Sequence, residues 1–152
     1  MSGPGLADFA GRWRIERAID DRLSGIPGRF EGTAVFAPEG AFLRYREEGL
    51  LFPGAAPPMA AERQYLWSEA GGRIRVAFAD GSPFHDFAPA DPAATHFCAP
   101  DRYAVRYDFS RWPGWTAEWT VSGPRKDYTM ISRYQRAGPP SQAMPVSAGS
   151  NG

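Results

Sequence analysis

The residues best able to perform chemistry lie in one short stretch, between His85 and Asp101. His85 and His96 flank a loop, and Cys98 and Asp101 follow closely. Imidazole, thiolate and carboxylate groups are the ligands that zinc prefers, and His96-x-Cys98 puts two of them on one face of a strand. The spacing matches no common zinc pattern, so the sequence specifies no metal site. An acid–base site built on a histidine stays an alternative, because histidine titrates near neutral pH.

A second set of residues suggests a ligand cavity. Several side chains that should point inward from the strands have a polar group at their tip. A mostly apolar lumen with a few placed donors is typical of a small-molecule pocket. The opposing interpretation is that the tyrosines are core residues and that the arginines pair with Glu47, Glu62 or Glu118. The inward polar residues are Arg17, Tyr45, Arg63, Tyr65, Tyr103, Tyr107, Ser132 and Tyr134.

A third candidate is Lys126-Asp127-Tyr128, which follows Gly123-Pro124. The pattern predicts a turn with a local ion pair, or alternatively a rim of the fold that holds a ligand. An even number of strand passes from the Asp80-Gly81 turn puts both turns at one rim. We therefore expect His85, His96, Tyr103, Trp119 and Lys126 to approach one another. The full set of predicted ligand-binding residues is Arg17, Arg63, Tyr65, His85, His96, Tyr103, Tyr107, Trp119, Lys126 and Tyr134.

Strands must position these side chains, because no stretch has a helical period of useful length. Gly11-Arg12-Trp13 opens the first alternating run, in which Trp13, Ile15 and Ile19 share a face. Similar runs follow, separated by turns rich in glycine, proline and aspartate. Strands are expected at 12–19, 29–37, 41–48, 61–68, 73–79, 83–87, 95–98, 102–109, 115–121 and 127–136.

Short connections favour pairing between sequence neighbours, and closing such a meander removes its edges. We therefore predict an all-β chain folded as a single antiparallel up-and-down β-barrel of about eight to ten strands, with a β-sandwich as the alternative. The chain has 152 residues, which fits one domain. Residues 1–11 form a lead, 12–137 the barrel and 138–152 a flexible tail rich in Gly, Pro, Ser and Ala.

Several sequence blocks resemble one family of short bacterial proteins classed as a domain of unknown function. The resemblance supplies no activity, but it implies that the His-bearing and Lys-Asp-Tyr blocks occur together and hints at one shared site. The blocks are Gly11-Arg12-Trp13, Tyr65-x-Trp67, Asp80-Gly81-x-Pro83-Phe84-His85, His96-x-Cys98-x-x-Asp101-x-Tyr103, Trp119-x-Val121-x-Gly123-Pro124-x-Lys126-Asp127-Tyr128 and Tyr134-x-Arg136.

More remotely, Gly11-x-Trp13 with a late arginine resembles the lipocalin or calycin barrels. The resemblance implies that Trp13 plugs one end of the barrel and that Arg133 or Arg136 packs across it. The pair Arg63-x-Tyr65 is also similar in type to the Arg-x-Tyr pair with which fatty-acid-binding barrels hold a carboxylate.

Charge and cysteine content limit the partners. The chain has 17 basic and 17 acidic residues, which argues against nucleic acid or an anionic membrane as a partner. Cys98 is the only cysteine, so no internal disulfide is expected. The first eight residues lack the features of a signal peptide, and no apolar run approaches the ~20 residues of a membrane span. A cytoplasmic location is therefore expected.

The sequence thus favours a barrel that binds a small molecule, with an apolar or aromatic body and an anionic group, and that exists as a monomer or small homo-oligomer. It specifies no cofactor. A small barrel enzyme that uses His85 or His96 as acid or base is one alternative, and a protein-interaction module is another. A deep lumen reached by both histidines near a carboxylate would favour the enzyme.

Overall fold

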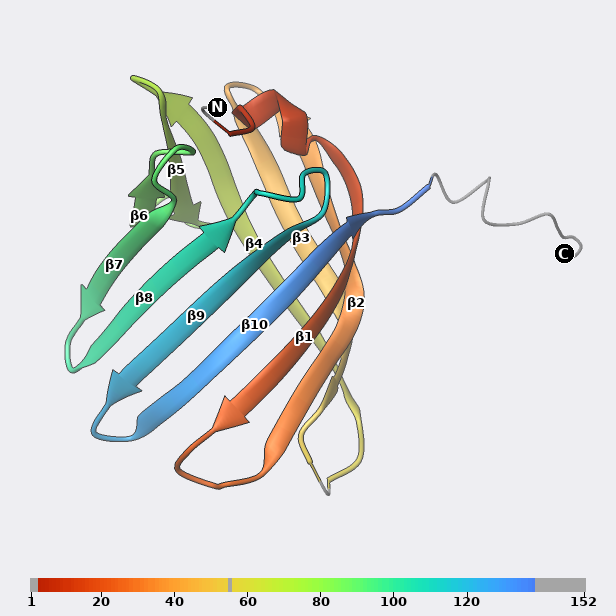
Figure 1. Ribbon diagram of the computed structural model, residues 1–152, viewed down its shortest axis with the longest axis vertical. Helices are drawn as coiled ribbons and strands as arrows, with labels where there is room; N and C mark the ends of the chain where they lie inside the picture. The colour runs from red at the N-terminus through yellow and green to blue at the C-terminus, as the bar shows by residue number, and fades with distance from the viewer. Residues whose placement is uncertain (1–2, 55, 139–152) are drawn as a thin grey trace, which may run out of the picture.

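The structure, a computed structural model, describes residues 3–54 and 56–138. They form ten antiparallel strands in one strongly curved sheet, preceded by a short 3₁₀ helix (Figure 1). The predicted all-β up-and-down barrel is confirmed. The elements are η1 (Leu6–Phe9), β1 (Gly11–Asp21), β2 (Pro27–Glu39), β3 (Phe42–Phe52), β4 (Met59–Ala70), β5 (Arg73–Phe78), β6 (Pro83–Phe87), β7 (Ala93–Cys98), β8 (Asp101–Asp108), β9 (Trp115–Gly123) and β10 (Lys126–Arg136).

Strands adjacent in sequence pair with each other, except β6 and β7. β1 pairs with β10, and the sheet has the order β6-β5-β4-β3-β2-β1-β10-β9-β8-β7. Its edges, β6 and β7, meet along a seam without a ladder between them in the described residues, so the barrel is nearly closed. The pairing of sequence neighbours expected of a meander is therefore missing between β6, which carries His85, and β7, which carries His96, although the two strands lie side by side. β6 has five residues, begins with Pro83 and contains a bulge, all of which oppose a regular ladder.

Aromatic side chains fill one end of the barrel. η1 lies across this end (Figure 1), and the ring of Phe9 is fully buried beneath it. The Phe9 ring centroid lies 5.0 Å from that of Trp112, and Trp112 lies 5.6 Å from Trp13. Edge-to-face and tilted ring pairs at such distances add to the stabilisation from burial. These three residues form an aromatic plug that closes the barrel at this end.

Arg136 fastens the plug to the last strand. Its guanidinium carbon lies 4.0 Å from the centroid of the Trp13 ring, and its Nη1 donates to the carbonyl oxygen of Ala10 at 2.8 Å. Trp13 Nε1 in turn donates to the carbonyl oxygen of Phe9 at 2.9 Å. Gly11 has a φ of +119°, and a methyl group there would lie 3.0 Å from Arg136 Nη1. The arginine that packs across Trp13 is thus Arg136.

A close approach of the β2 and β3 backbones explains why glycine occupies two paired positions. Gly32 pairs with Gly49, and a methyl group on Gly32 would lie 2.2 Å from the carbonyl oxygen of Glu48. A methyl group on Gly49 would lie 2.1 Å from the carbonyl oxygen of Glu31. The structure shows a tight backbone contact there, which a side chain at either position would disrupt.

The opposite end of the barrel is open. The loops between β1 and β2, β3 and β4, β7 and β8, and β9 and β10 all lie there (Figure 1). The strand order also puts the Asp80-Gly81 turn at the same end as the β9–β10 turn, as the sequence predicted. In the described ranges, no helix is long and apolar enough to cross a membrane. The tail expected at 138–152 lies outside the described residues except for Gly138.

Replacing Arg136 by alanine should destabilise the barrel, because Trp13 loses its stacked cation and Ala10 loses a charged donor. We expect a loss of about 1–3 kcal/mol in the free energy of unfolding, measured by urea denaturation. Arg133→Ala, at an exposed position three residues earlier on the same strand, is the matched control. An equal effect of the two substitutions would contradict the role given to Arg136.

Candidate functional site

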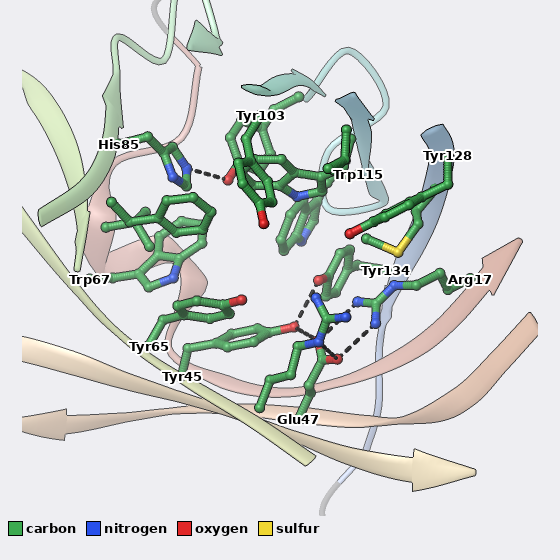
Figure 2. Close-up of a pocket in the computed structure, with 18 residues that line it drawn as sticks. Arg17, Tyr45, Glu47, Tyr65, Trp67, His85, Tyr103, Trp115, Tyr128 and Tyr134 are labelled. Carbon is green, nitrogen blue, oxygen red and sulfur yellow. Dashed lines mark hydrogen bonds and ion pairs between the residues drawn. The ribbon is translucent and has the colours of Figure 1, made fainter. Parts of the chain in front are cut away.

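A cavity lies in the lumen of the barrel (Figure 2). Its free volume is about 80 Å³. The inward faces of strands on both sides of the barrel line it, because alternate side chains of a strand point to the same side. Of the ten predicted ligand-binding residues, eight line it: Arg17, Arg63, Tyr65, His85, Tyr103, Tyr107, Trp119 and Tyr134.

A buried ion pair forms one wall of the cavity. Arg17 donates from Nη1 and Nη2 to the two carboxylate oxygens of Glu47, at 2.8 and 2.9 Å, and from Nε to the Ser132 hydroxyl at 2.6 Å. Arg17 is 7% exposed and Glu47 is 2% exposed. The two-pronged geometry suits an arginine and a carboxylate, and it joins β1, β3 and β10. The interpretation that an inward arginine pairs with Glu47 therefore holds for Arg17.

Two tyrosines extend this pair into a network. The Tyr45 hydroxyl donates to Glu47 Oε1 and lies 2.8 Å from the Tyr134 hydroxyl. The Tyr134 ring stacks on Trp115 with 3.8 Å between centroids. Burial, followed by the nearby Glu47 charge, raises the pKa of Tyr134 to about 12. Both hydroxyls therefore stay protonated near neutral pH. We name Arg17, Tyr45, Glu47, Ser132 and Tyr134 the Arg17–Glu47 network.

The charges of this network are retained despite burial. Burial alone would lower the pKa of Arg17, but the hydrogen bonds and charge of Glu47 outweigh it and raise that pKa. Burial would likewise raise the pKa of Glu47, but Arg17 lowers it. Arg63 adds a second cation, with its Nε 3.9 Å from Glu47 Oε2 and its side chain 47% exposed. The wall therefore carries one positive charge in excess.

His85 faces the cavity from the other side (Figure 2). Its Nε2 lies 2.9 Å from the Tyr107 hydroxyl. Burial, followed by the charge of His96, lowers the pKa of His85 to about 4. The imidazole is therefore neutral near pH 7.

Three buried nitrogen atoms at the cavity have no hydrogen-bond partner in the described part of the chain. They are Trp67 Nε1, His85 Nδ1 and Trp115 Nε1. All three residues line the same cavity. A tryptophan N–H can only donate, and a buried donor without an acceptor is unfavourable. Two residues that line the cavity, Trp67 and Trp115, thus each carry a buried donor without a partner.

The ring of Phe84 lies among four of the residues that were expected to approach one another. Its ring centroid lies 4.6 Å from that of His85, 5.3 Å from His96, 6.1 Å from Tyr103 and 5.2 Å from Trp119. The expected approach of these four residues is therefore observed, around a phenylalanine that the sequence analysis did not select.

Two predicted residues lie outside the cavity lining. Lys126 donates to the Tyr103 hydroxyl at 3.0 Å and pairs with Asp101 at 3.1 Å, and these bonds raise its pKa. It therefore supports Tyr103 from the β9–β10 turn. His96 packs its ring against Phe84 rather than reaching the lumen.

The residues considered for metal binding lie in different surroundings. Cys98 is exposed, and Asp101 is paired with Lys126. Across residues 3–54 and 56–138, no three His, Cys, Asp or Glu side chains gather as metal ligands would. Glu47, the buried carboxylate at the cavity, is bound to Arg17 rather than to a histidine.

Comparison with known sequences identifies the family. A model described as "Family of unknown function (DUF6314)" matches residues 9–136. The chain belongs to the DUF6314 family. The match extends from Phe9 of the plug to Arg136, and so covers the whole barrel and its cavity. No curated protein matches this DUF6314 chain.

A solved structure has the same fold as this DUF6314 barrel. It is the S-type phycobiliprotein lyase CPES from Guillardia theta, with a TM-score of 0.66 and 9% sequence identity. The alignment covers 88% of this chain and 91% of the lyase chain. At this identity, the likeness concerns the arrangement of strands.

Several residues of the DUF6314 site escaped the sequence analysis. Glu47 follows Tyr45 by two positions, so strand alternation would have placed it inward, although it appeared only as a partner for arginines. Trp67 was named only in the Tyr65-x-Trp67 block and Trp115 was not singled out, and neither was considered as a donor. Strand alternation in the sequence does not predict that Phe84 points inward, because its inward position depends on a bulge. Tyr45 was predicted to point inward, and the other lining residues outside the predicted ligand-binding set are Glu47, Trp67, Val76, Phe84, Trp115, Ala117, Val121, Tyr128 and Met130.

Glu47→Gln should strongly destabilise the fold, because it leaves the Arg17 charge buried without a counter-charge. Removing one partner of a buried pair costs about 3–5 kcal/mol, which urea denaturation can measure. Glu48→Gln, on the outer face next to it, should change the free energy of unfolding by less than about 1 kcal/mol. A loss at Glu47 no larger than at Glu48 would show that the pair does not stabilise the barrel.

Stability should also fall in mild acid because of His85. The unfolded chain takes up a proton near the ordinary histidine pKa of 6.5, whereas folded His85 does so only near pH 4. The contribution of neutral His85 to the free energy of unfolding is complete above about pH 6.5. It is lost as the pH falls to 4, and the total loss is about 3 kcal/mol. His85→Gln should remove this part of the pH dependence of urea unfolding, and His96→Gln should retain most of it. Equal pH profiles for wild type and His85→Gln would exclude the assignment.

Proposed function

We propose that the barrel binds a small molecule that presents a hydrogen-bond acceptor, such as a carboxylate or carbonyl oxygen, to the lumen. The observation that carries this proposal is the convergence of Trp67 Nε1, Trp115 Nε1 and His85 Nδ1, all buried and unpartnered, on one cavity. Leaving a buried donor unpaired costs about 1–3 kcal/mol. A ligand oxygen between the two indoles would recover that energy.

Charge supports an anionic acceptor. Arg17 is neutralised by Glu47, but Arg63 lies at the same wall, half exposed and 3.9 Å from Glu47. A carboxylate in the cavity would meet this second guanidinium. The ion pair between Arg17 and Glu47 would stay intact, because separating it would leave a buried charge unpaired.

The walls support an aromatic or apolar body. Tyr65, Trp119 and Met130 line the cavity beside the donors. The free volume of about 80 Å³ is well below the ~300–1,000 Å³ of pockets for drug-sized ligands. The ligand, or the part of it inside the lumen, is therefore small. The structural neighbour is named a phycobiliprotein lyase. The likeness between the two folds supports a barrel that holds a ligand in its lumen.

Binding is better supported than acid–base catalysis. A general base works best with a pKa near the working pH, whereas the pKa of His85 is lowered to about 4. His96 does not line the cavity, and Glu47 is held by Arg17. We therefore prefer a binding protein to the enzyme. Its cytoplasmic location and its oligomeric state stay predictions from sequence.

Native mass spectrometry of the protein purified from its own host tests the proposal directly. A retained small molecule of defined mass, released on unfolding, is the expected result. Absence of any bound species, together with no binding of small aromatic acids by calorimetry, would contradict the proposal.

A single substitution tests the role of the indole donors. Trp115→Phe keeps an aromatic ring against Tyr134 but removes an unpartnered N–H. We expect benzoate, used as a probe in isothermal titration calorimetry, to bind about 5–10-fold more weakly, as for one lost hydrogen bond. Trp112→Phe, in the aromatic plug and away from the cavity, should leave benzoate affinity unchanged. Equal affinities of both variants and wild type would refute the donor role.

A further inference from the structure

Phe84 occupies an irregular position in the sheet. In the pairing of β5 with β6, Val76 pairs with His85 and Ala77 pairs with Pro83, so Phe84 has no partner. An extra residue of this kind is a β-bulge, which redirects a side chain and is common beside binding sites. The bulge turns Phe84 inward next to His85, so that two consecutive side chains face the same lumen.

The Phe84 ring lies in a stack of flat side chains. It is nearly parallel to Trp119, with 11° between planes and 5.2 Å between centroids. It also stacks with Phe78 at 4.5 Å and Tyr65 at 5.7 Å. The space that the phenyl group fills is therefore shaped for a flat aromatic ring, with other rings on its faces.

Phe84 separates two spaces. On the inside is the cavity of about 80 Å³, and on the outside is a groove of about 810 Å³ that extends over β5 and β6 to β7. Phe84 and His85 line both. Since the described residues of β6 and β7 form no ladder, moving this part of β6 would break no backbone ladder across the seam, although the bond between His85 Nε2 and the Tyr107 hydroxyl does cross it.

We propose that Phe84 determines the size of ligand that the lumen accepts. The inference rests on the proposed function and adds the ligand class. With the phenyl ring in place, the lumen holds a small acid. An aromatic acid with two fused rings binds only when the ring is withdrawn toward the seam. Its ring system then takes the place of Phe84 against Trp119, and its carboxylate faces the unpartnered nitrogen of Trp115.

The test compares benzoate with 2-naphthoate by isothermal titration calorimetry, across a size series at this position. Phe84→Ala and Phe84→Leu should raise the affinity for 2-naphthoate relative to benzoate at least about tenfold, as expected from burying a further ring. Phe84→Trp should abolish naphthoate binding. Phe87→Leu is the control, because Phe87 is fully buried on the same strand but does not line the cavity.

The outcomes separate this inference from the proposed function. Binding of both acids with a ratio that does not depend on residue 84, or that changes equally in Phe87→Leu, would overturn the role of Phe84 and leave the binding function intact. No binding of either acid to wild type or to any folded variant would overturn both. If Phe84→Ala does not fold, by near-ultraviolet circular dichroism, the Leu and Trp variants still decide the question.

Discussion

The buried ion pair of Arg17 and Glu47 is the constraint on which the interior of this barrel depends. Two charges in a lumen of aromatic side chains are tolerated only when every donor and acceptor is matched. Ser132 and Tyr45 complete that matching, and Tyr134 bonds to Tyr45. The network thereby fixes the relative positions of β1, β3 and β10, and its tyrosines form one side of the cavity.

The two ends of the barrel differ in how they are filled. Beyond the network, the aromatic plug removes apolar surface from water and closes one end, with Arg136 holding Trp13 to the last strand. Toward the other end the lumen stays partly open, with Arg63 half exposed beside the buried pair. Hydrophobic packing thus supplies stability at one end and leaves a cavity with unpartnered donors toward the other.

The seam between β6 and β7 is the one place where the described strands of the barrel are not joined by a ladder. β6 and β7 are short edge strands. Their unpaired sides face each other without forming a ladder in the described residues. A bulge in β6 places Phe84 and His85 together at the point where the wall is weakest. The two residues that line both the cavity and the outer groove therefore lie on a short edge strand with an irregular ladder.

The sequence by itself determined the strands, their order and the face of most side chains, because a period of two assigns inward residues such as Tyr45, Tyr107 and Tyr134 without knowledge of the neighbours. It left open which arginine would meet Glu47, and only the register between β1, β3 and β10 brought Arg17 there. The bulge at Phe84 and the exclusion of His96 and Lys126 from the cavity also depended on tertiary structure. Each arises from how the sheet closes on itself, through contacts between strands that local alternation does not specify.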